Sequence, residues 1–485
     1  MKLNHLDSVR HYCRRAQYSS MVMLLLVLTT VVAGFSGCSE TTRDSETSRD
    51  PEPTQPPGSA ASIVVDTLTR FQTMTGWEAV AQAGQEQPGF AQWGAEVLDA
   101  AVNDLGINRI RLEVRSGSEN TSDYFKPGWD DGTQEKRCAR LATVNDNIYP
   151  QIINPNGFHF GEIDSKVSRV VLPIRDRLVA RGERLFLSLT YVAFVNQCRP
   201  PVYVHENPDE YAEFILATFL HLRSTYGLVP DAVEIILEPN TAGAPWNGNL
   251  IGRAIVTTSA RLAASGFNPV FVAPSSSTLA STIQMASDIF QVPGVKPHLR
   301  EISYHRYGGG DVNSLTTLAD LAASHGVGTA MLEHIGSGAE ELYTDITVGQ
   351  VSAWEQFTLA FGGPGDGGGT YFRIVDGRAV RAERTRYLRQ YFKYVRLGAR
   401  RVKAESADAG VRPVAFRNAD GRLVVVMHIA GSHQLILKGL SAGTYGASVT
   451  TLSATGTELG DRTIAARENL TVTVAGPGIV TVYRK

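Results

Sequence analysis

Two glutamates that end short apolar runs are the residues of this chain best placed to do chemistry. Glu238 follows Val233–Leu237 and precedes Pro239, and Glu333 follows Gly328–Leu332. Their β-branched residues and the proline stop indicate buried parallel strands, because proline cannot donate to a strand ladder. We therefore expect each carboxylate at the carboxyl end of a barrel strand, where catalytic groups collect. The two glutamates are 95 residues apart, about three strand-helix units of roughly 30 residues each.

Two carboxylates on one barrel face predict cleavage of a glycosidic bond. In a retaining glycosidase one carboxylic acid protonates the leaving oxygen and the other carboxylate attacks the anomeric carbon, with the carboxyl groups about 5 Å apart. We assign the acid/base role to Glu238 and the nucleophile role to Glu333. The acid should be protonated near neutral pH while the nucleophile stays ionised. An inverting hydrolase would instead hold the two carboxyl groups more than about 6.5 Å apart.

Three side chains on other strands are expected to support this pair. Arg111, at the end of the second strand, is the expected cationic partner of Glu333. Arg109 shares its strand face, so one of the two arginines is expected to be only a structural ion-pair partner. His305 and Tyr307, two apart on the sixth strand, are expected to donate hydrogen bonds to Glu333 or to a sugar hydroxyl.

Further substrate contacts are predicted for Tyr191 at a strand end, for Asn240 in the turn after the acid/base residue, and for Trp246 as a stacking surface. A lone tryptophan is more often a core residue than a substrate contact. Among the tryptophans, Trp246 is preferred because it lies just past that turn. The other tryptophans considered for stacking are Trp77, Trp129 and Trp354. No Cys or His spacing is typical of a metal site and no glycine run has a phosphate-binding spacing, so we expect neither a metal nor an organic cofactor.

Strand-like runs alternate with helical patterns from about Ile63 onward. The eight expected strands lie at 75–80, 108–114, 184–191, 233–240, 269–274, 301–307, 328–334 and 369–375. Helical spacing is clearest over 167–180 and 208–226. Strict alternation implies a parallel sheet, and eight units imply a closed (β/α)8 barrel, the TIM barrel.

The pattern changes after about Ala382. Residues 385–397 are typical of a last helix, and from Arg412 short alternating strands are separated by Gly and Ser. Such spacing is typical of an antiparallel β-sandwich. We therefore predict a barrel over 63–395 and a β-sandwich domain over 396–485, which could include the strand 63–72.

Residues 1–38 have the pattern of an export signal. Three arginines precede an apolar run over 21–33, and Phe35-Ser36-Gly37-Cys38 follows. This ending resembles a bacterial lipobox, so Cys38 would become the lipidated first residue of the mature protein. Ser39 follows it, not the aspartate that resembles an inner-membrane retention signal, which favours the outer membrane or cell surface. The alternative, an uncleaved anchor, needs a longer apolar run.

The segment 39–62 is almost entirely Ser, Thr, Asp, Glu and Pro, and is predicted to be an extended linker. With Cys13 discarded with the signal and Cys38 lipidated, Cys138 and Cys198 are left as the pair that could form a disulfide. An oxidising compartment would permit the bond, and two unpaired thiols are the alternative.

The chain has 485 residues, of which 43% are hydrophobic and 19% charged, and this size allows two or three domains. Its net charge of −2 provides no basic footprint for nucleic acid. We therefore expect a carbohydrate substrate, a membrane contact through the lipid anchor and a monomeric protein.

From about Ile63 to the C-terminus the sequence resembles glycoside hydrolase family 30, within the clan of retaining (β/α)8 glycosidases. Five segments carry the resemblance: FQTMTGW (71–77), LGINRIR (105–111), EP (238–239), LE (332–333) and YFKYVRLGARRV (391–402). The resemblance implies a barrel joined to a β-sandwich, the same two catalytic glutamates, and β-glucosidic, β-1,6-glucan, xylan or related substrates.

Three residues in two segments depart from the clan pattern. Leu237 stands where the clan usually has the asparagine that binds the sugar 2-hydroxyl, and Tyr371 and Phe372 stand where it usually has tryptophan. Either Asn240 replaces the missing amide, or the substrate differs at carbon 2, or activity is lost. The last possibility defines the alternative function, a non-catalytic surface glycan-binding lipoprotein.

Overall fold

The computed structural model describes residues 58–125, 138–194, 203–243, 246–365 and 367–485. The predicted signal (1–38), with the Cys38 predicted to be lipidated, and most of the predicted linker (39–62) lie outside the described residues. In the described part of the chain, no helix is both long and apolar enough to cross a membrane.

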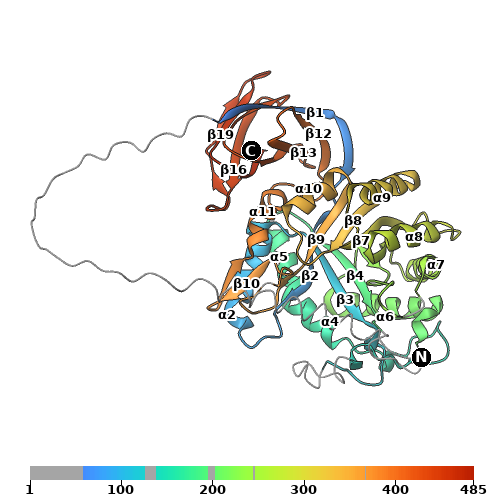
Figure 1. Cartoon of the computed structure of the whole chain (residues 1–485). Coiled ribbons are helices and arrows are strands. Elements are labelled where there is room, and N and C mark those ends of the chain that lie inside the picture. The colour runs from blue at the N-terminus through green and yellow to red at the C-terminus, as the bar shows by residue number, and fades with distance from the viewer. Residues whose placement is uncertain (1–57, 126–137, 195–202, 244–245, 366) are drawn as a thin grey trace, which may run out of the picture. The chain divides into compact units, whose positions relative to one another are not determined.

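Eight parallel strands close into a barrel, and a helix follows each of them (Figure 1). In chain order the strands are β2 (Gly76–Ala83), β3 (Arg109–Arg115), β4 (Phe186–Val192), β5 (Ala232–Glu234), β6 (Val270–Thr278), β7 (Leu299–Gly308), β8 (Gly328–Glu333) and β9 (Val351–Ala360). The helices are α2 (Phe90–Asp99), α4 (Gly161–Lys166), α5 (Leu172–Ala180), α6 (Pro208–Tyr226), α7 (Gly248–Ala264), α8 (Leu279–Phe290), α9 (Val312–His325), α10 (Ala339–Thr347) and α11 (Glu383–Phe392). The predicted TIM barrel is confirmed.

Helix boundaries in the barrel follow local signals in the sequence. Helix α6 begins where the Asn207 side chain accepts from the Asp209 amide and Pro208 fills the first turn, and it ends at Gly227 in the left-handed conformation. π-Helical turns extend α2 over Ala100–Leu105 and join α4 to α5 over Val167–Val171, so the helix predicted at 167–180 begins earlier. Short 3-10 turns lie at Ser116–Ser118, Pro155–Gly157 and Val204–Glu206.

The last barrel strand is not the predicted one. The run 369–375 was expected to close the barrel, but β9 does so by pairing with both β2 and β8. The expected segment contributes β10 (Phe372–Val375), which forms a hairpin with β11 (Arg378–Arg381) outside the barrel. Strand β9 carries buried polar residues such as Ser352 and Glu355, so it does not read as an apolar run.

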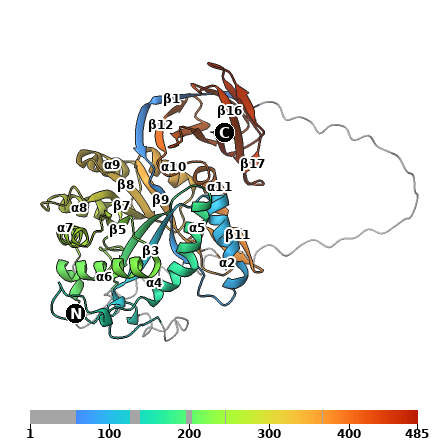
Figure 2. The same ribbon diagram turned by 180° about the vertical axis from the view of Figure 1, so that it is seen from behind.

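The second domain is one curled sheet of ten strands that wraps its own apolar core. Its strands are β1 (Ser59–Thr73), β12 (Arg400–Ser406), β13 (Val411–Arg417), β14 (Leu423–Ile429), β15 (His433–Lys438), β16 (Gly443–Thr450), β17 (Thr457–Glu458), β18 (Arg462–Ile464), β19 (Leu470–Val474) and β20 (Gly478–Arg484). All pairs are antiparallel except β1 with β15. Figure 2 shows the blue β1 beside these red C-terminal strands.

Strand β1 corrects the predicted start of the folded part. Residues 59–62 were expected to belong to the linker, yet they pair with β15 from Ser59 opposite His433 to Ser62 opposite Ile436. Ala61 is buried in the core of the sheet. Their small side chains have weak strand preference, so pairing and burial rather than local sequence decide their conformation.

The segment that follows α11 packs against the bottom of the barrel. Trp77 of β2 stacks on Phe392 with ring centroids 4.4 Å apart, and its indole Nε1 donates to Val395 O at 2.6 Å. Arg396 donates to Gly106 O at 2.7 Å. These contacts join the 391–402 segment to the strand-entry segment 71–77 and to the turn before β3.

Candidate active site

The backbone that delivers Glu238 leaves regular strand geometry early. Strand β5 ends at Glu234, four residues before the predicted acid. Pairing continues irregularly, because the amide of Leu237 donates to Tyr191 O at 2.9 Å and that of Glu238 donates to Ser275 O at 3.1 Å. Glu238 and Ser275 have φ values of 47° and 54°, a region that costs a non-glycine residue about 1–3 kcal/mol. The fold therefore holds the carboxylate at a strained position.

His305 contacts the Glu238 carboxyl group. Its Nδ1 lies 2.9 Å from Glu238 Oε1, and the Thr241 hydroxyl donates to Oε2 at 3.1 Å. Burial raises the pKa of Glu238, but the hydrogen bond and charge of His305, the Thr241 bond and the charge of Arg111 outweigh it, so the pKa lies below its usual value. The free site thus favours the carboxylate, not the protonated acid that the sequence predicts. The hydrogen bond predicted from His305 to Glu333 is made to Glu238 instead.

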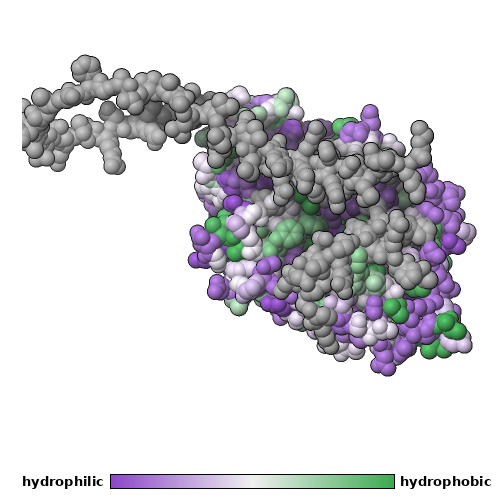
Figure 3. Space-filling view, turned by 60° about the horizontal axis from the view of Figure 1, so that its bottom comes forward, coloured by the Kyte–Doolittle hydropathy of each residue, from purple (hydrophilic) through white to green (hydrophobic). Residues whose placement is uncertain are grey.

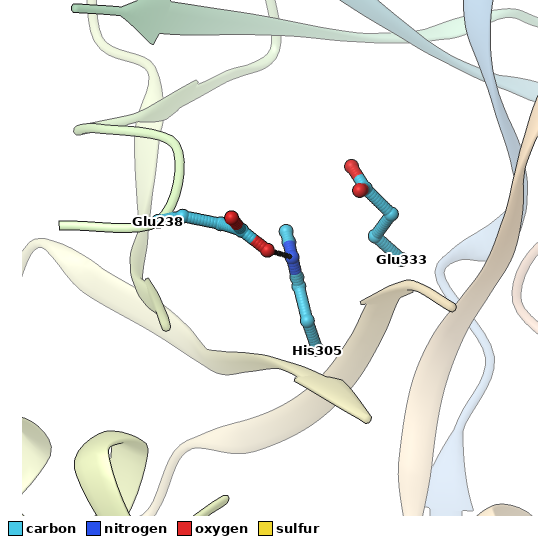
Figure 4. Close-up of side chains that lie close together, drawn as sticks. All are labelled: Glu238, His305 and Glu333. Carbon is cyan, nitrogen blue, oxygen red and sulfur yellow. Dashed lines mark hydrogen bonds and ion pairs between the residues drawn. The ribbon is translucent and has the colours of Figure 1, made fainter. Parts of the chain in front are cut away.

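Glu333 ends β8 and holds two charge-stabilising bonds. Tyr307 Oη donates to its Oε1 at 2.9 Å, and Arg111 Nη1 donates to its Oε2 at 3.0 Å. Both contacts were predicted. Glu238, His305 and Glu333 point into one space (Figure 4), and one polar atom from each lies within 4.8 Å of the others. This close approach fits the retaining geometry, in which the two carboxyl groups lie about 5–5.5 Å apart.

Strand β3 carries two buried arginines with different partners. Five glutamates pair with them: Glu234, Glu333 and Glu355 around Arg111, and Glu78 and Glu301 around Arg109. Arg111 therefore reaches the predicted nucleophile Glu333, whereas Arg109 is the structural ion-pair partner that the sequence left open. Buried charges of this kind are stable only when paired.

The same catalytic groups are, among the described residues, the set whose atom types and spacing could hold a metal ion. Both oxygens of Glu333 already accept hydrogen bonds, from Tyr307 and from the cationic Arg111. A divalent cation beside that guanidinium would meet like charge, so the residues fit a metal poorly. The predicted absence of a metal stays a prediction.

Tyr191 and Trp246 lie behind the site and do not face a ligand. Tyr191 is fully buried, and its Oη lies 2.8 Å from Tyr203 Oη and 2.7 Å from His205 Nδ1. Trp246 is 4% exposed, donates from Nε1 to Tyr203 Oη, and packs its ring edge-on against Tyr211. The structure corrects both predicted substrate contacts, because burying these large rings stabilises the loops around β4 and β5.

Neither Leu237, just before Glu238, nor Asn240, two residues after it, offers a free side-chain amide. Asn240 is exposed, but its Nδ2 donates to Ser277 Oγ at 2.7 Å and its Oδ1 accepts from the Ser277 amide at 3.0 Å. It therefore ties the turn to β6. Leu237 packs with Leu141 and Val192 in a small apolar cluster, so it offers no hydrogen bond to a sugar hydroxyl.

An apolar rim at the ends of β7, β8 and β9 was missed by sequence reasoning. Phe357, near the end of β9, is half-buried, and Phe361 just beyond the strand is 47% exposed. Tyr307 of β7 and Ile335 after β8, which are joined by a hydrogen bond from the Ile335 amide to Tyr307 Oη, are 44% and 40% exposed. The aromatic residues near the end of β9 are visible in the sequence, but the rim can be predicted only if β9 is recognised as the last barrel strand. In Figure 3, apolar patches are scattered over a mainly hydrophilic face, one of them near its middle.

The remaining residues singled out in the sequence have simpler positions. Trp77 and Trp354 are buried core residues, and Trp354 Nε1 donates to Asp345 Oδ2 at 2.9 Å. Trp129 lies outside the described residues. Cys138 is disulfide-bonded, whereas Cys198, its predicted partner, lies outside the described residues.

Comparison with solved structures identifies the fold. The catalytic domain of family 30 xylanase C from Talaromyces cellulolyticus superposes with a TM-score of 0.65 at 13% identity, over 87% of this chain and 100% of that one. The chain has the fold of glycoside hydrolase family 30. A family 30 endoxylanase from Clostridium papyrosolvens gives 0.63 at 16% identity over the same shares, and an endo-β-1,6-glucanase gives 0.60 at 16% identity over 89% and 94%. No family model and no curated protein sequence matches the chain.

The barrel of this protein holds a buried glutamate, Glu78, whose ionisation should change the free energy of unfolding. Burial, opposed by Arg109, raises the pKa of Glu78 to about 7. The folded protein then binds the proton of Glu78 more tightly than the unfolded chain does. The protonated Glu78 therefore stabilises the fold at low pH, and this stabilisation is lost as the pH rises from the usual pKa of a glutamate to above about 7. We expect Glu78→Gln, which cannot ionise, to gain about 1–3 kcal/mol of unfolding free energy relative to wild type between about pH 5 and pH 8.

Urea unfolding of both proteins at the two pH values measures this difference. The exposed Glu405→Gln is the control, and it should stay within about 0.5 kcal/mol of wild type at both. An unchanged gap between Glu78→Gln and wild type across the two pH values would show that Glu78 titrates normally.

Proposed function

We propose that this protein is a retaining glycosidase that cleaves a β-linked glycan or glycoside through a covalent glycosyl-enzyme intermediate. One observation carries the proposal: Glu238 and Glu333 converge from separate strands with polar atoms within 4.8 Å, which fits double displacement. The fold shared with xylanases and with an endo-β-1,6-glucanase supports xylan, β-1,6-glucan or a related glycan as the substrate class.

In the first half-reaction a Glu333 oxygen bonds to the anomeric carbon while the glycosidic C–O bond breaks, and Glu238 gives its proton to the leaving oxygen. Tyr307 and Arg111 hold the attacking carboxylate in place before the attack. Glu238 must enter this step as the acid. His305 Nδ1, at 2.9 Å, can accept a hydrogen bond from the protonated Glu238 or donate one to its carboxylate.

In the second half-reaction the Glu238 carboxylate takes a proton from water, and the water oxygen bonds to the anomeric carbon as the ester to Glu333 breaks. The lowered pKa of Glu238 suits this step, because a base must be ionised. The covalent intermediate also removes the negative charge of Glu333 from the site, and this favours the ionised form of Glu238 further. His305 is therefore placed to serve both half-reactions.

We also propose that the enzyme is held at the bacterial cell envelope through a lipid on Cys38, in the outer membrane or at the cell surface, and that it acts as a monomer without a cofactor. The pattern of residues 1–38 supports the anchor. The linker after it would hold the barrel away from the membrane.

A second candidate function is glycan binding without hydrolysis, and Leu237 favours it. The hydrogen bond to the sugar 2-hydroxyl is one that strengthens in the transition state, and the apolar Leu237 cluster cannot make it. Against this stands the intact pair of glutamates, whose mutual repulsion a pure binding protein has no reason to keep.

Loss of the nucleophile should abolish turnover. We expect Glu333→Gln to lower kcat by at least about 10³-fold on any substrate that wild type hydrolyses. The measurement uses protein lacking residues 1–38 and a panel of aryl β-glycosides and oligosaccharides that includes 2-acetamido and 2-deoxy sugars. Circular dichroism should show an unchanged fold, and Glu405→Gln should keep wild-type activity.

The same panel separates the two candidate functions. Full activity of Glu333→Gln would refute the nucleophile assignment. Binding of a glycan by wild type without hydrolysis of any panel member would select the binding protein.

Loss of the acid should depend on the leaving group. We expect Glu238→Gln to keep kcat/KM within about tenfold for aryl glycosides with good leaving groups, because these need little protonation. For poor leaving groups kcat/KM should fall about 10²–10⁴-fold. An equal loss of kcat/KM for all members of a series of aryl glycosides, whose phenol leaving groups differ in pKa, would count against Glu238 as the acid.

The anchor is tested by lipid labelling in cells. We expect a labelled fatty acid to be incorporated into the full-length protein and the label to be lost in Cys38→Ser, because acylation requires that thiol. Cys13→Ser is the matched control and should keep the label. Labelling of Cys38→Ser would contradict the proposal.

A further inference from the structure

Glu355 is a buried glutamate beside the nucleophile that has no part in the steps above. It lies on β9 and is fully buried, and its Oε1 is 3.5 Å from Arg111 Nη1. That nitrogen already donates to Glu333 Oε2 and to Leu332 O, both at 3.0 Å. A terminal guanidinium nitrogen carries two hydrogens. Both are therefore used, and Glu355 receives neither.

The surroundings of Glu355 disfavour its ionised form. Neither of its oxygens accepts a hydrogen bond from the part of the chain that the structure describes. Its register partner on β2 is Glu78, a second buried glutamate. Burial, opposed by Arg111 and reinforced by the charges of Glu78, Glu333 and Glu234, raises the pKa of Glu355.

The other carboxyl groups nearby have closer partners than Glu355 has. Glu234 Oε2 accepts from the Thr190 hydroxyl at 2.7 Å and lies 3.4 Å from Arg111 Nε. Glu78 lies 2.9 Å from a guanidinium nitrogen of Arg109. A proton in this cluster is consequently held most readily by Glu355.

The groups that face Glu355 come from each strand packed near it: Glu78 of β2, Arg111 of β3, Glu234 of β5, Glu333 of β8 and Tyr371 after β9. Tyr371 donates to the backbone oxygen of Glu78 at 3.0 Å, and burial raises its pKa well above the usual value. It therefore stays neutral. The only cation among these groups is Arg111, which has to serve three carboxyl groups.

We propose that Glu355 is a positioning residue that, as a neutral acid, leaves Arg111 Nη1 to the nucleophile Glu333. Loss of the proton from Glu355 creates a carboxylate that competes for that nitrogen and repels Glu333. The hydrogen bond that orients the nucleophile then weakens, and activity falls on the alkaline side. This inference rests on the proposed glycosidase function, and Glu355 itself touches neither the substrate nor the reacting atoms.

Infrared difference spectroscopy of the free full-length protein at neutral pH tests whether the Glu355 carboxyl group is protonated. We expect Glu355→Gln to remove one C=O stretch of a neutral carboxylic acid. The matched control is Glu301→Gln in the same barrel interior, where Thr75, Arg109 and Ser352 donate to the carboxylate. It should remove an ionised-carboxylate band. An undiminished neutral-acid signal in Glu355→Gln overturns the proposal, whereas Glu78, with a pKa of about 7, contributes its own band in both proteins.

The coupling to the nucleophile is tested in a Glu238→Gln background, where the acid/base residue no longer titrates. The readout is kcat/KM against pH for an aryl glycoside with a good leaving group, which reports only steps up to formation of the intermediate. We expect the single variant to lose about tenfold per pH unit on the alkaline side. Adding Glu355→Gln should abolish that loss and leave the neutral-pH value unchanged.

Each outcome decides a separate point. Identical alkaline profiles with and without Glu355→Gln overturn the positioning role even if the infrared band is lost. A lower kcat/KM at every pH in the double variant points to a merely structural role and also overturns it. If wild type hydrolyses no glycoside, the proposed function fails, while the infrared spectrum still decides whether Glu355 holds a proton.

Discussion

Arg111 is fully buried inside the barrel and faces three carboxyl groups, one of which is the proposed nucleophile Glu333. Removing Arg111 would take away the cation that these three carboxyl groups share, and buried charges without a partner are costly. The barrel must therefore keep β3, β5, β8 and β9 in the register that turns these side chains inward, since a slip of one residue would turn them to the opposite face. Strand β3 meets this condition by pairing Arg111 with Val80 of β2 and with Ser188 of β4.

The two catalytic glutamates are held in different ways, and the difference fits their proposed roles. Glu333 is the last residue of β8, and both its oxygens have donors, so its position is fixed before attack. Glu238 lies on an irregular segment with φ of 47° and shares a hydrogen bond with His305. A nucleophile must be preorganised, whereas an acid/base residue must exchange a proton twice in each cycle. The irregular segment places Glu238 beside an imidazole, which ladder geometry alone would not ensure.

The sequence predicted what depends on local pattern and failed where tertiary packing decides. Alternating strands and helices gave the barrel, and carboxylates at the ends of apolar runs gave Glu238 and Glu333, because strand order places such ends on one face. Strand β9 was missed because its inward positions carry polar groups that serve the interior ion pairs, which removes the apolar signal. Trp246 and Tyr191 were assigned to the substrate because sequence gives a residue's place along the chain but not the depth to which neighbouring loops bury it.

The part of the site that would hold the sugar has little hydrogen-bonding capacity near the acid/base residue. Leu237 is packed among apolar neighbours, and both polar atoms of the Asn240 amide are engaged with Ser277. Two contributions to transition-state binding then remain on the described surface. One is stacking on the rim that includes Phe361. Stacking tolerates different sugars because it requires only an apolar face of the sugar ring. The other is the charge of Glu333, which is stabilised by Arg111 and opposes the positive charge that develops at the anomeric carbon. For the proposed glycosidase, a site that depends on charge at the reacting carbon and on stacking would discriminate weakly at carbon 2, because neither contribution involves the 2-hydroxyl.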